Sequence, residues 1–137
     1  MTSGDPDGVT LRRLIKQVVA ARPVDLIHAH GTGTVFNDPI ELAAFDAECV
    51  RDDSPAPLVY SHKGALGHSL GASGLVSTAL SCLMHRRGVV LPNARTTNPL
   101  ATRGVQIHSS AKSQAIGRSI ITAAGFGGPI AVVSLVS

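Results

Sequence analysis

The sequence predicts a layered α/β domain, in which helices pack against a sheet of short strands. Segments whose apolar residues recur at helical spacing alternate along the chain with short apolar segments typical of strands. The 137 residues are 44% hydrophobic and 15% charged, which is typical of a globular protein and not of a disordered chain. Because this length suits one hydrophobic core, we expect residues 1–137 to form a single domain.

The first half of the sequence predicts two helices and two strands. Pro23 ends the first helix, whose apolar residues recur at helical spacing. Asp38 precedes Pro39, so we expect Asp38 to be the N-cap of the second helix and Glu41 to complete a capping box. The expected elements are a helix over residues 9–21, a strand over 24–29, the loop HGTGT at 30–34, a helix from 38 to about 50 and a strand over 58–61.

The second half is organised around the glycine-rich stretch SHKGALGHSLGASG at residues 61–74. Its glycines allow tight bends before His68, and we expect a loop that delivers Lys63 and His68 to a site. A helix is expected to follow, with small residues on one face, and we expect Leu75, Ala79, Leu80 and Leu83 to continue it as a packed element. Farther on, we expect an irregular segment at 91–102, a strand over 105–109, and two strands over 119–124 and 130–136 joined by a turn at 125–129.

Three loops that follow predicted strands carry the residues with useful chemistry. Loops of this kind gather at one edge of an α/β sheet, so we expect His30, Lys63, His68 and Phe126 to meet there. Two neutral imidazoles can donate N–H groups to one developing oxyanion or transfer a proton. A lysine buried near them needs a counter-charge, and Glu41 is the candidate.

Charge and cysteine usage exclude several classes of function and location. The net charge is +3 and the basic residues are dispersed without interleaved aromatics, so we expect no nucleic-acid partner. The N-terminal segment is polar and acidic, unlike a signal peptide, and glycines and a proline interrupt the apolar C-terminal run, so no membrane span is expected. Cys49 and Cys82 form no CxxC pattern, which is typical of a reducing cytoplasm.

Several motifs occur in order over about residues 5–137: HGTGT from His30, NDPIE from Asn37, KGALGHSLGASG from Lys63 and GFGG from Gly125. Together they resemble the C-terminal part of a β-ketoacyl-acyl carrier protein synthase, a condensing enzyme of fatty-acid or polyketide synthesis. The resemblance implies the C-terminal half of a thiolase-like layered α/β/α/β/α fold, with a mixed sheet and packed helices. It also implies decarboxylative Claisen condensation of an acyl thioester with malonyl-carrier protein.

The resemblance implies a role for each matching residue. His30 and His68 are the two active-site histidines, which assist decarboxylation and stabilise the enolate and the thioester oxyanion. Lys63 is the site lysine, paired with Glu41. The other implied roles are pantetheine binding by Thr32 and Thr34, gating by Phe126, and structural support of the site by Asp38, Gly127 and Gly128. No cofactor of the chain's own is implied, because the substrates are carried on the phosphopantetheine of an acyl carrier protein, an implied partner.

The chain departs from the family pattern at the nucleophile. The family's catalytic cysteine lies in the N-terminal half, at a helix N-terminus, whereas Cys49 and Cys82 lie inside predicted helices. We therefore expect residues 1–137 to be an incomplete thiolase half that works with a partner chain carrying the cysteine, as a dimer of heterodimers. His28 stands where many relatives carry Asn or Glu, and Ile130 stands where the family usually has Asn.

Two hypotheses follow from the sequence. In the first, the chain is the C-terminal subunit of a split β-ketoacyl synthase and supplies His30 and His68 to the cysteine of the partner. In the second, it is a non-catalytic partner subunit with a chain-length or structural role, or a decayed fragment. A metal site built from histidines is disfavoured because Lys63 would repel a cation. The glycine pattern is not that of a phosphate-binding loop.

Overall fold

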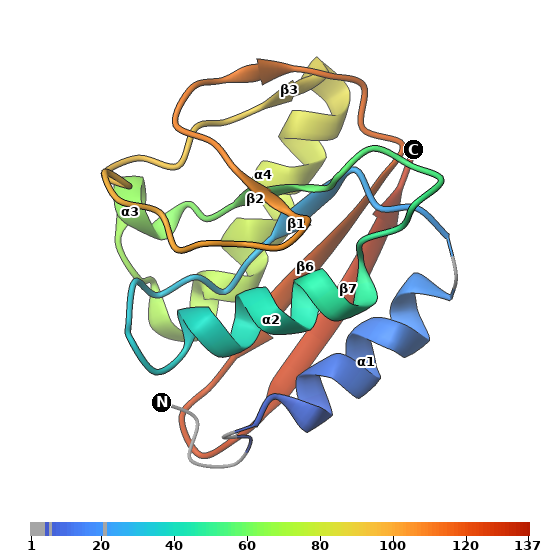
Figure 1. The fold of residues 1–137 in the computed structure, drawn as a ribbon. Coiled ribbons are helices and arrows are strands. Elements are labelled where there is room, and N and C mark those ends of the chain that lie inside the picture. The colour runs from blue at the N-terminus through green and yellow to red at the C-terminus, as the bar shows by residue number, and fades with distance from the viewer. Residues whose placement is uncertain (1–4, 6, 21) are drawn as a thin grey trace.

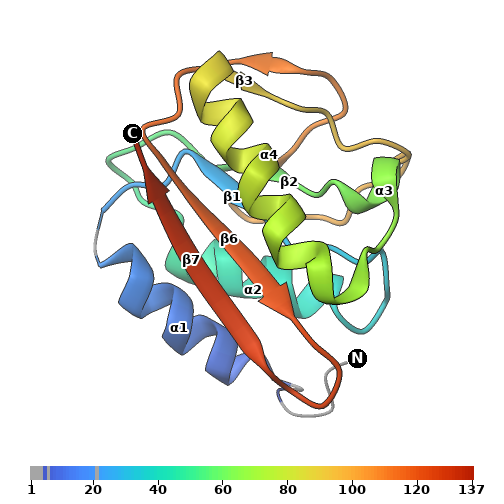
Figure 2. The ribbon, with the colours of Figure 1, turned by 180° about the vertical axis from the view of Figure 1, so that it is seen from behind.

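The computed structural model describes the chain except residues 1–4, 6 and 21. Helices α1 (Val9–Val19) and α2 (Asp38–Glu48) cover one face of a sheet, and helix α4 (Ser73–Arg87) covers the other. Figure 1 and Figure 2 show these two faces from opposite sides. The arrangement confirms the predicted layered α/β class.

Five strands form the main sheet, in the order β4-β2-β1-β6-β7. All neighbours are parallel except β6 and β7, which form an antiparallel hairpin. The central strand β1 lies between β2 and β6, so that His28 is opposite Tyr60 on one side and Ile121 on the other. The strands are β1 (Leu26–His28), β2 (Leu58–Tyr60), β4 (Gln106–Ile107), β6 (Arg118–Ala124) and β7 (Ile130–Val136).

Helix α1 is fixed at both ends by side chains from outside the helix. At its start, the Asp5 carboxylate accepts hydrogen bonds from the backbone N–H groups of Thr10 and Leu11, both at 2.9 Å. At its end, the Arg118 guanidinium on β6 donates to the carbonyl oxygens of Val18 and Val19, at 2.6 and 3.0 Å. These bonds satisfy backbone groups that a helix leaves free at its termini, and they join α1 to a strand formed much later in the sequence.

Two apolar clusters lie on the two faces of the sheet. Successive strand residues point to opposite faces, so Leu26 belongs to one cluster and Ile27 to the other. The cluster on the side of α1 and α2 contains Leu11, Ile15, Val19, Val24, Ile27, Ala29, Ala44, Phe45, Cys49, Val59, Val105 and Ile120. The cluster on the side of α4 contains Leu26, Leu58, Tyr60, Met84, Val90 and Ile116.

Helix α4 turns a polar face to the sheet. Its buried residues are Ser73, Ser77, Ser81 and Met84. Leu75 and Leu83, in contrast, are 73% and 49% exposed. The expected packing is therefore wrong for Leu75, Leu83 and Ala79, which are exposed, whereas Leu80 is partly buried. A row of serines gives no apolar periodicity, so the pattern of the sequence pointed to the opposite face of the helix.

The segments before and after α4 are less regular than expected. A short helix α3 (Lys63–Leu66) and a 3₁₀ turn η1 (Leu70–Ala72) precede it, so the helix does not begin directly after His68. Strands β3 (Val89–Val90) and β5 (Lys112–Ser113) form a small antiparallel sheet that the sequence did not predict. In the part of the chain that the structure describes, no helix has the length and apolar character needed to cross a membrane.

Candidate active site

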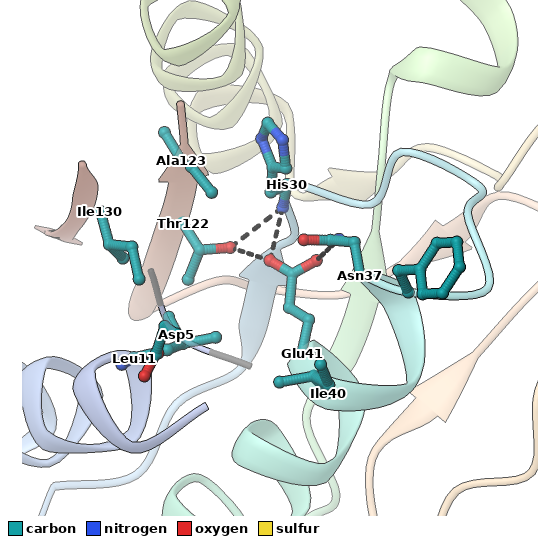
Figure 3. A pocket seen from close by; sticks show the side chains of 11 residues that line it. Asp5, Leu11, His30, Asn37, Ile40, Glu41, Thr122, Ala123 and Ile130 are labelled. Carbon is teal, nitrogen blue, oxygen red and sulfur yellow. Dashed lines mark hydrogen bonds between the residues drawn. The ribbon is translucent and has the colours of Figure 1, made fainter. Parts of the chain in front are cut away.

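The loop HGTGT, residues 30–34, leaves the carboxyl end of β1 and is held by a carboxylate from α2. Glu41 accepts hydrogen bonds from the backbone N–H groups of His30 and Gly31, both at 2.8 Å. Thr122 on β6 donates its hydroxyl to the same carboxylate, and Asn37 donates its side-chain amide at 3.2 Å. Figure 3 shows three of these partners, His30, Thr122 and Asn37, converging on Glu41. This set of donors fits the ionised form of a buried carboxylate, because that form only accepts hydrogen bonds.

Asp38 and Glu41 do not form the predicted capping box. Asn37 is the N-cap of α2, and Asp38 is the first residue inside the helix. The Asp38 carboxylate instead accepts the backbone N–H of Gly33 at 3.0 Å. The capping prediction is therefore wrong, because both carboxylates bind N–H groups of the HGTGT loop and not those of their own helix. Both residues nevertheless fix the conformation of that loop.

Lys63 binds the same loop from the other side. Its ammonium donates to the backbone carbonyl oxygen of His30, whose N–H is bound by Glu41. The one ion pair among the described residues joins Arg12 to Glu48, so Lys63 and Glu41 are not in direct contact and the expected pairing is indirect. Burial lowers the pKa of Lys63, while the negative charges of Glu41 and Asp38 oppose that shift.

The side chains of His30 and His68 face each other, as the sequence predicts. Their ring centroids lie 5.3 Å apart at an interplanar angle of 78°, which is an edge-to-face arrangement. The backbone N–H of Leu70 donates to Nδ1 of His68 at 3.0 Å. Nδ1 of His68 therefore carries no proton, and in the neutral ring Nε2 carries the proton and is a hydrogen-bond donor.

Both histidines of this pair are neutral near pH 7. Burial, the charge of Lys63 and the neighbouring His68 lower the pKa of His30 from 6.5 to about 4. Burial and Lys63 also lower the pKa of His68. A neutral imidazole has one N–H group and one free nitrogen, so the pair can present N–H donors to an oxyanion without being charged itself.

These residues lie within a segment that matches a known family. The family described as Beta-ketoacyl synthase, C-terminal domain, matches residues 2–97 of the chain. The chain belongs to this family. A type II PKS ketosynthase, solved in complex with its acyl-carrier protein, superposes with a TM-score of 0.88 at 23% identity, over 100% of this chain and 35% of that one. The ketosynthase from module 6 of the bacillaene synthase of Bacillus subtilis 168 superposes with a TM-score of 0.86 at 20% identity, over 98% of this chain and 28% of that one. These neighbours confirm the thiolase-like ketosynthase fold.

Relatives in sequence are far longer than this ketosynthase domain. Highly-reducing polyketide synthase 1 of Aureobasidium melanogenum is 36% identical over 95% of this chain and 7% of its own length. Highly reducing polyketide synthase easB of Emericella nidulans is 38% identical over 76% of this chain and 4% of its own length. Spectinabilin polyketide synthase system protein NorC of Streptomyces orinoci is 37% identical over 69% of this chain and 4% of its own length. The chain thus spans a small part of each of these relatives.

Thr32 and Thr34 of the ketosynthase domain lie in the HGTGT loop with their hydroxyl oxygens 3.1 Å apart. They line a cavity of about 520 Å³ together with Lys63 and the irregular segment 93–100. The two threonines expected to bind pantetheine therefore share one cavity with the site lysine. Pantetheine binding itself stays a prediction.

The segment around Lys63 is locked against the irregular segment by close contacts. A Cβ atom on Gly64 would lie 2.1 Å from the backbone carbonyl oxygen of Ala94, so no larger residue fits there without moving the backbone. The side chain of Asn93 accepts the backbone N–H of Ser61 at 2.9 Å. The position of the Lys63 ammonium therefore depends on residues about thirty positions later in the sequence.

Phe126 stands at the turn between β6 and β7. Gly127 and Gly128 adopt φ angles of 84° and 102°, which favour glycine, and the N–H of Gly125 closes the turn on the carbonyl oxygen of Pro129 at 2.9 Å. At 82% exposed, Phe126 is not packed against the histidine pair. The expected meeting of all three loops therefore holds for the histidines and the lysine, while the gating role of Phe126 stays a prediction.

A smaller cavity of about 170 Å³ adjoins His30 (Figure 3). It lies between the start of α1, α2 and the β6–β7 hairpin. Ile130, which occupies the position where the family usually has Asn, lines this cavity. Its lining also includes Asp5, Leu11, Phe36, Asn37, Ile40, Glu41, Thr122, Ala123 and Ala124.

Two buried histidines that the sequence did not assign to the site are neighbours of site residues along the chain: His28 precedes His30 by two residues, and His62 directly precedes Lys63. Nε2 of His28 is 3.0 Å from Nδ1 of His62, and Nδ1 of His28 is 2.9 Å from Oγ of Ser81 on α4. Burial, His62 and Lys63 lower the pKa of His28 to about 3. Among the described residues, no three His, Cys, Asp or Glu side chains are placed to hold a metal ion. The alternation of His28 with His30 along one strand was the signal for this cluster.

The cysteines of the ketosynthase domain lie outside the histidine site. Cys49 is 1% exposed in the apolar cluster beside α2, and burial raises the pKa of its thiol to about 12. Cys82 is exposed on α4, next to Ser81 but outside the buried face of the helix. A catalytic cysteine needs an accessible thiolate near the reacting groups, and neither residue offers one.

Proposed function

We propose that this domain supplies the two histidines of a decarboxylative condensation, and that a ketosynthase N-terminal half on a partner chain supplies the nucleophilic cysteine. The observation that carries the proposal is the facing pair of neutral imidazoles, His30 and His68, with ring centroids 5.3 Å apart beside the Lys63 ammonium. N–H donors arranged in this way suit a negative charge that develops on a thioester oxygen.

The proposed reaction joins an acyl thioester to malonyl-carrier protein. The malonyl group loses its carboxylate as CO₂, and the electron pair of the broken bond forms an enolate whose oxygen accepts the N–H groups of His30 and His68. The enolate carbon attacks the carbonyl carbon of the acyl group on the partner's cysteine, and the cysteine leaves as a thiolate. Both imidazoles act as neutral N–H donors, which agrees with lowered pKa values that keep the rings from taking up a second proton.

The other residues of the site bind and position. Lys63 and Glu41 hold the backbone of the HGTGT loop from its two sides. We assign pantetheine binding to Thr32 and Thr34 because their hydroxyls line the cavity beside Lys63. Phe126 is assigned to gating because it lies at the turn between β6 and β7 and is 82% exposed.

Apolar side chains left exposed beside the site support a partner half. Leu66, Leu70 and Leu75 are 66%, 67% and 73% exposed along α3, η1 and the start of α4. Large apolar patches are seldom left open on a soluble monomer, so we propose that the N-terminal half covers this surface, within a dimer of heterodimers. One structural neighbour is a ketosynthase in complex with its acyl-carrier protein, which supports a carrier protein as the second partner.

A non-catalytic subunit with a structural or chain-length role is the second candidate. It is favoured by the position of Ile130, which puts an apolar side chain in the cavity beside His30 where the family usually has Asn. The two candidates differ in one consequence: only a catalytic domain needs its two imidazoles for turnover.

Replacement of each histidine separates the candidates. The complex is captured from its host through a tag on this chain and supplied with an acyl thioester and malonyl-carrier protein. His30→Ala and His68→Ala are each expected to lower the rate of decarboxylation at least about 100-fold, because loss of one oxyanion donor commonly costs that much. His85→Ala is the matched control, since His85 binds Ser119 and Ser137 at the far end of α4.

Native mass spectrometry of each captured complex accompanies the kinetics. The proposal requires that both variants retain the partner chain while turnover falls. Full turnover in both variants would refute the catalytic proposal and favour the non-catalytic subunit. A captured complex without any chain bearing a reactive cysteine would refute the partner half.

A further inference from the structure

A chain of hydrogen-bonded, buried polar side chains lies between α4 and the sheet, and we call it the line: Ser81, His28 and His62, with Ser77 beside His62. Ser81, His28 and His62 are all 0% exposed and are linked in that order. Oγ of Ser81 lies 2.9 Å from Nδ1 of His28, and Nε2 of His28 lies 3.0 Å from Nδ1 of His62. Ser77, one turn before Ser81, has its hydroxyl 3.4 Å from the same nitrogen of His62. None of these side chains has a role in the proposed condensation.

The strand register carries this line toward the catalytic pair. His28 on β1 is opposite Tyr60 on β2 in a parallel pair. His30 and His62 each follow this pair by two residues, in the segments that leave the ends of β1 and β2, and His62 is among the groups whose charge acts on His30. Each of these two rings has one buried nitrogen without a hydrogen-bond partner among the described residues: Nδ1 of His30 and Nε2 of His62. A buried nitrogen left unpaired is costly, so a link between the two is favoured.

The serine hydroxyl sets the direction of the hydrogen bonds along the line. Ser81 is fully buried, and His28 Nδ1 is the acceptor that the described part of the chain offers its O–H. If Ser81 donates there, Nδ1 of His28 is unprotonated and the proton of that ring lies on Nε2. His28 then donates to Nδ1 of His62, and the remaining proton of His62 lies on Nε2, the nitrogen without a partner.

We propose that His62 is a positioning residue that fixes the tautomer of His30. The Nε2–H of His62 donates, through one bridging water, to Nδ1 of His30. His30 then carries its proton on Nε2, so that this N–H is the donor available to the substrate. No direct hydrogen bond joins the two nitrogens among the described residues, and a bridging water commonly links two polar groups that are not in direct contact. This inference rests on the proposed role of His30 in the condensation.

The same tautomer is already fixed on the other catalytic histidine. The backbone N–H of Leu70 occupies Nδ1 of His68 and leaves its Nε2–H free. The other charged or titratable groups around His30 have partners of their own. Lys63 and Glu41 bind its backbone, and Nδ1 of His68, whose ring faces that of His30, accepts from Leu70. Asp5, in the cavity beside His30, binds N–H groups at the start of α1. His62 is therefore the group placed to do for His30 what Leu70 does for His68.

The test is the pH dependence of malonyl-thioester decarboxylation by the complex of this chain with its partner half. Without the donor, neutral His30 loses a hydrogen bond, so its pKa rises and the acid limb of the profile moves to higher pH. In His62→Leu the expected shift is about half to one pH unit, which corresponds to one hydrogen bond. Ser81→Ala, which breaks the far end of the line, is expected to give a smaller shift in the same direction, and His85→Gln is expected to give none.

Each outcome decides the proposal. An acid limb at the wild-type position in both His62→Leu and Ser81→Ala overturns it, even if the rates fall, because a merely structural role lowers the rate without moving the limb. If His62→Leu yields no folded complex, Ser81→Ala decides by the same criterion. His30→Ala separates this inference from the proposed function. Full decarboxylation in His30→Ala refutes the function, whereas its loss together with unshifted profiles refutes only the role of His62.

Discussion

Replacing Glu41 by Gln tests the hydrogen bonds that hold the HGTGT loop. The carboxylate receives the N–H groups of His30 and Gly31, both at 2.8 Å, together with bonds from Thr122 and Asn37. An amide has one acceptor oxygen, so in the variant one backbone N–H faces the amide NH₂ and stays unpaired. One unpaired buried donor and one lost charge-assisted bond together amount to about 3 kcal/mol of unfolding free energy. For a chain of this length that corresponds to a decrease in Tm of roughly 10 °C.

Differential scanning fluorimetry of the purified protein measures this change against a matched control. Glu48→Gln lies on the same helix and removes the ion pair with Arg12, whose side chain is 53% exposed. Exposed pairs contribute about 0–1 kcal/mol, so the control is expected to lose at most a few degrees. Burial raises the pKa of Glu41, and a protonated Glu41 would resemble Gln. Equal losses in the two variants would therefore refute the ionised carboxylate.

Two further predictions concern packing and pH. Gly64→Ala is expected to destabilise the protein by at least about 2 kcal/mol, because its Cβ would lie 2.1 Å from the backbone oxygen of Ala94. Gly71→Ala is the control and is expected to be nearly neutral, because the space around Gly71 is open. Equal Tm values for the two variants would contradict the close contact at Gly64. The second prediction concerns pH. The folded protein lowers the pKa of His28 to about 3 and that of His30 to about 4. Between pH 6.5 and 4 the unfolded chain therefore binds more protons than the folded one, so the free energy of unfolding falls as the pH falls. His30 alone accounts for about 3 kcal/mol between pH 7 and 4, and urea unfolding curves that coincide at pH 7 and 4.5 would contradict its neutral burial.

The sequence predicted the elements that a local pattern marks, such as apolar periodicity or a proline. Pro23 and the apolar spacing located α1, and the order of apolar segments located the main strands. The rule that loops gather at the carboxyl ends of parallel strands brought His30 to His68, which lie 38 residues apart in sequence and face each other in the structure. These features depend on periodicity and topology, which the sequence displays directly.

Features that depend on competition between partners were not predictable. Asp38 and Glu41 have the spacing of a capping box. Their carboxylates nevertheless accept N–H groups of the HGTGT loop and not N–H groups of their own helix. Lys63 prefers a carbonyl oxygen to the carboxylate that seemed its natural partner. The link from His28 to His62 joins residues on two strands, and only the register between those strands reveals it.

The attachment of α1 to β6 has a consequence for the order in which the domain folds. Strand β1 needs both β2 and β6 as neighbours, and the C-terminal end of α1 is completed by Arg118. During synthesis, every residue up to 117 leaves the ribosome before those contacts exist. The nascent domain therefore carries an open strand edge and an incomplete core until its last hairpin emerges. Such long-range pairing slows folding relative to a helical bundle of equal length, in which most contacts are local.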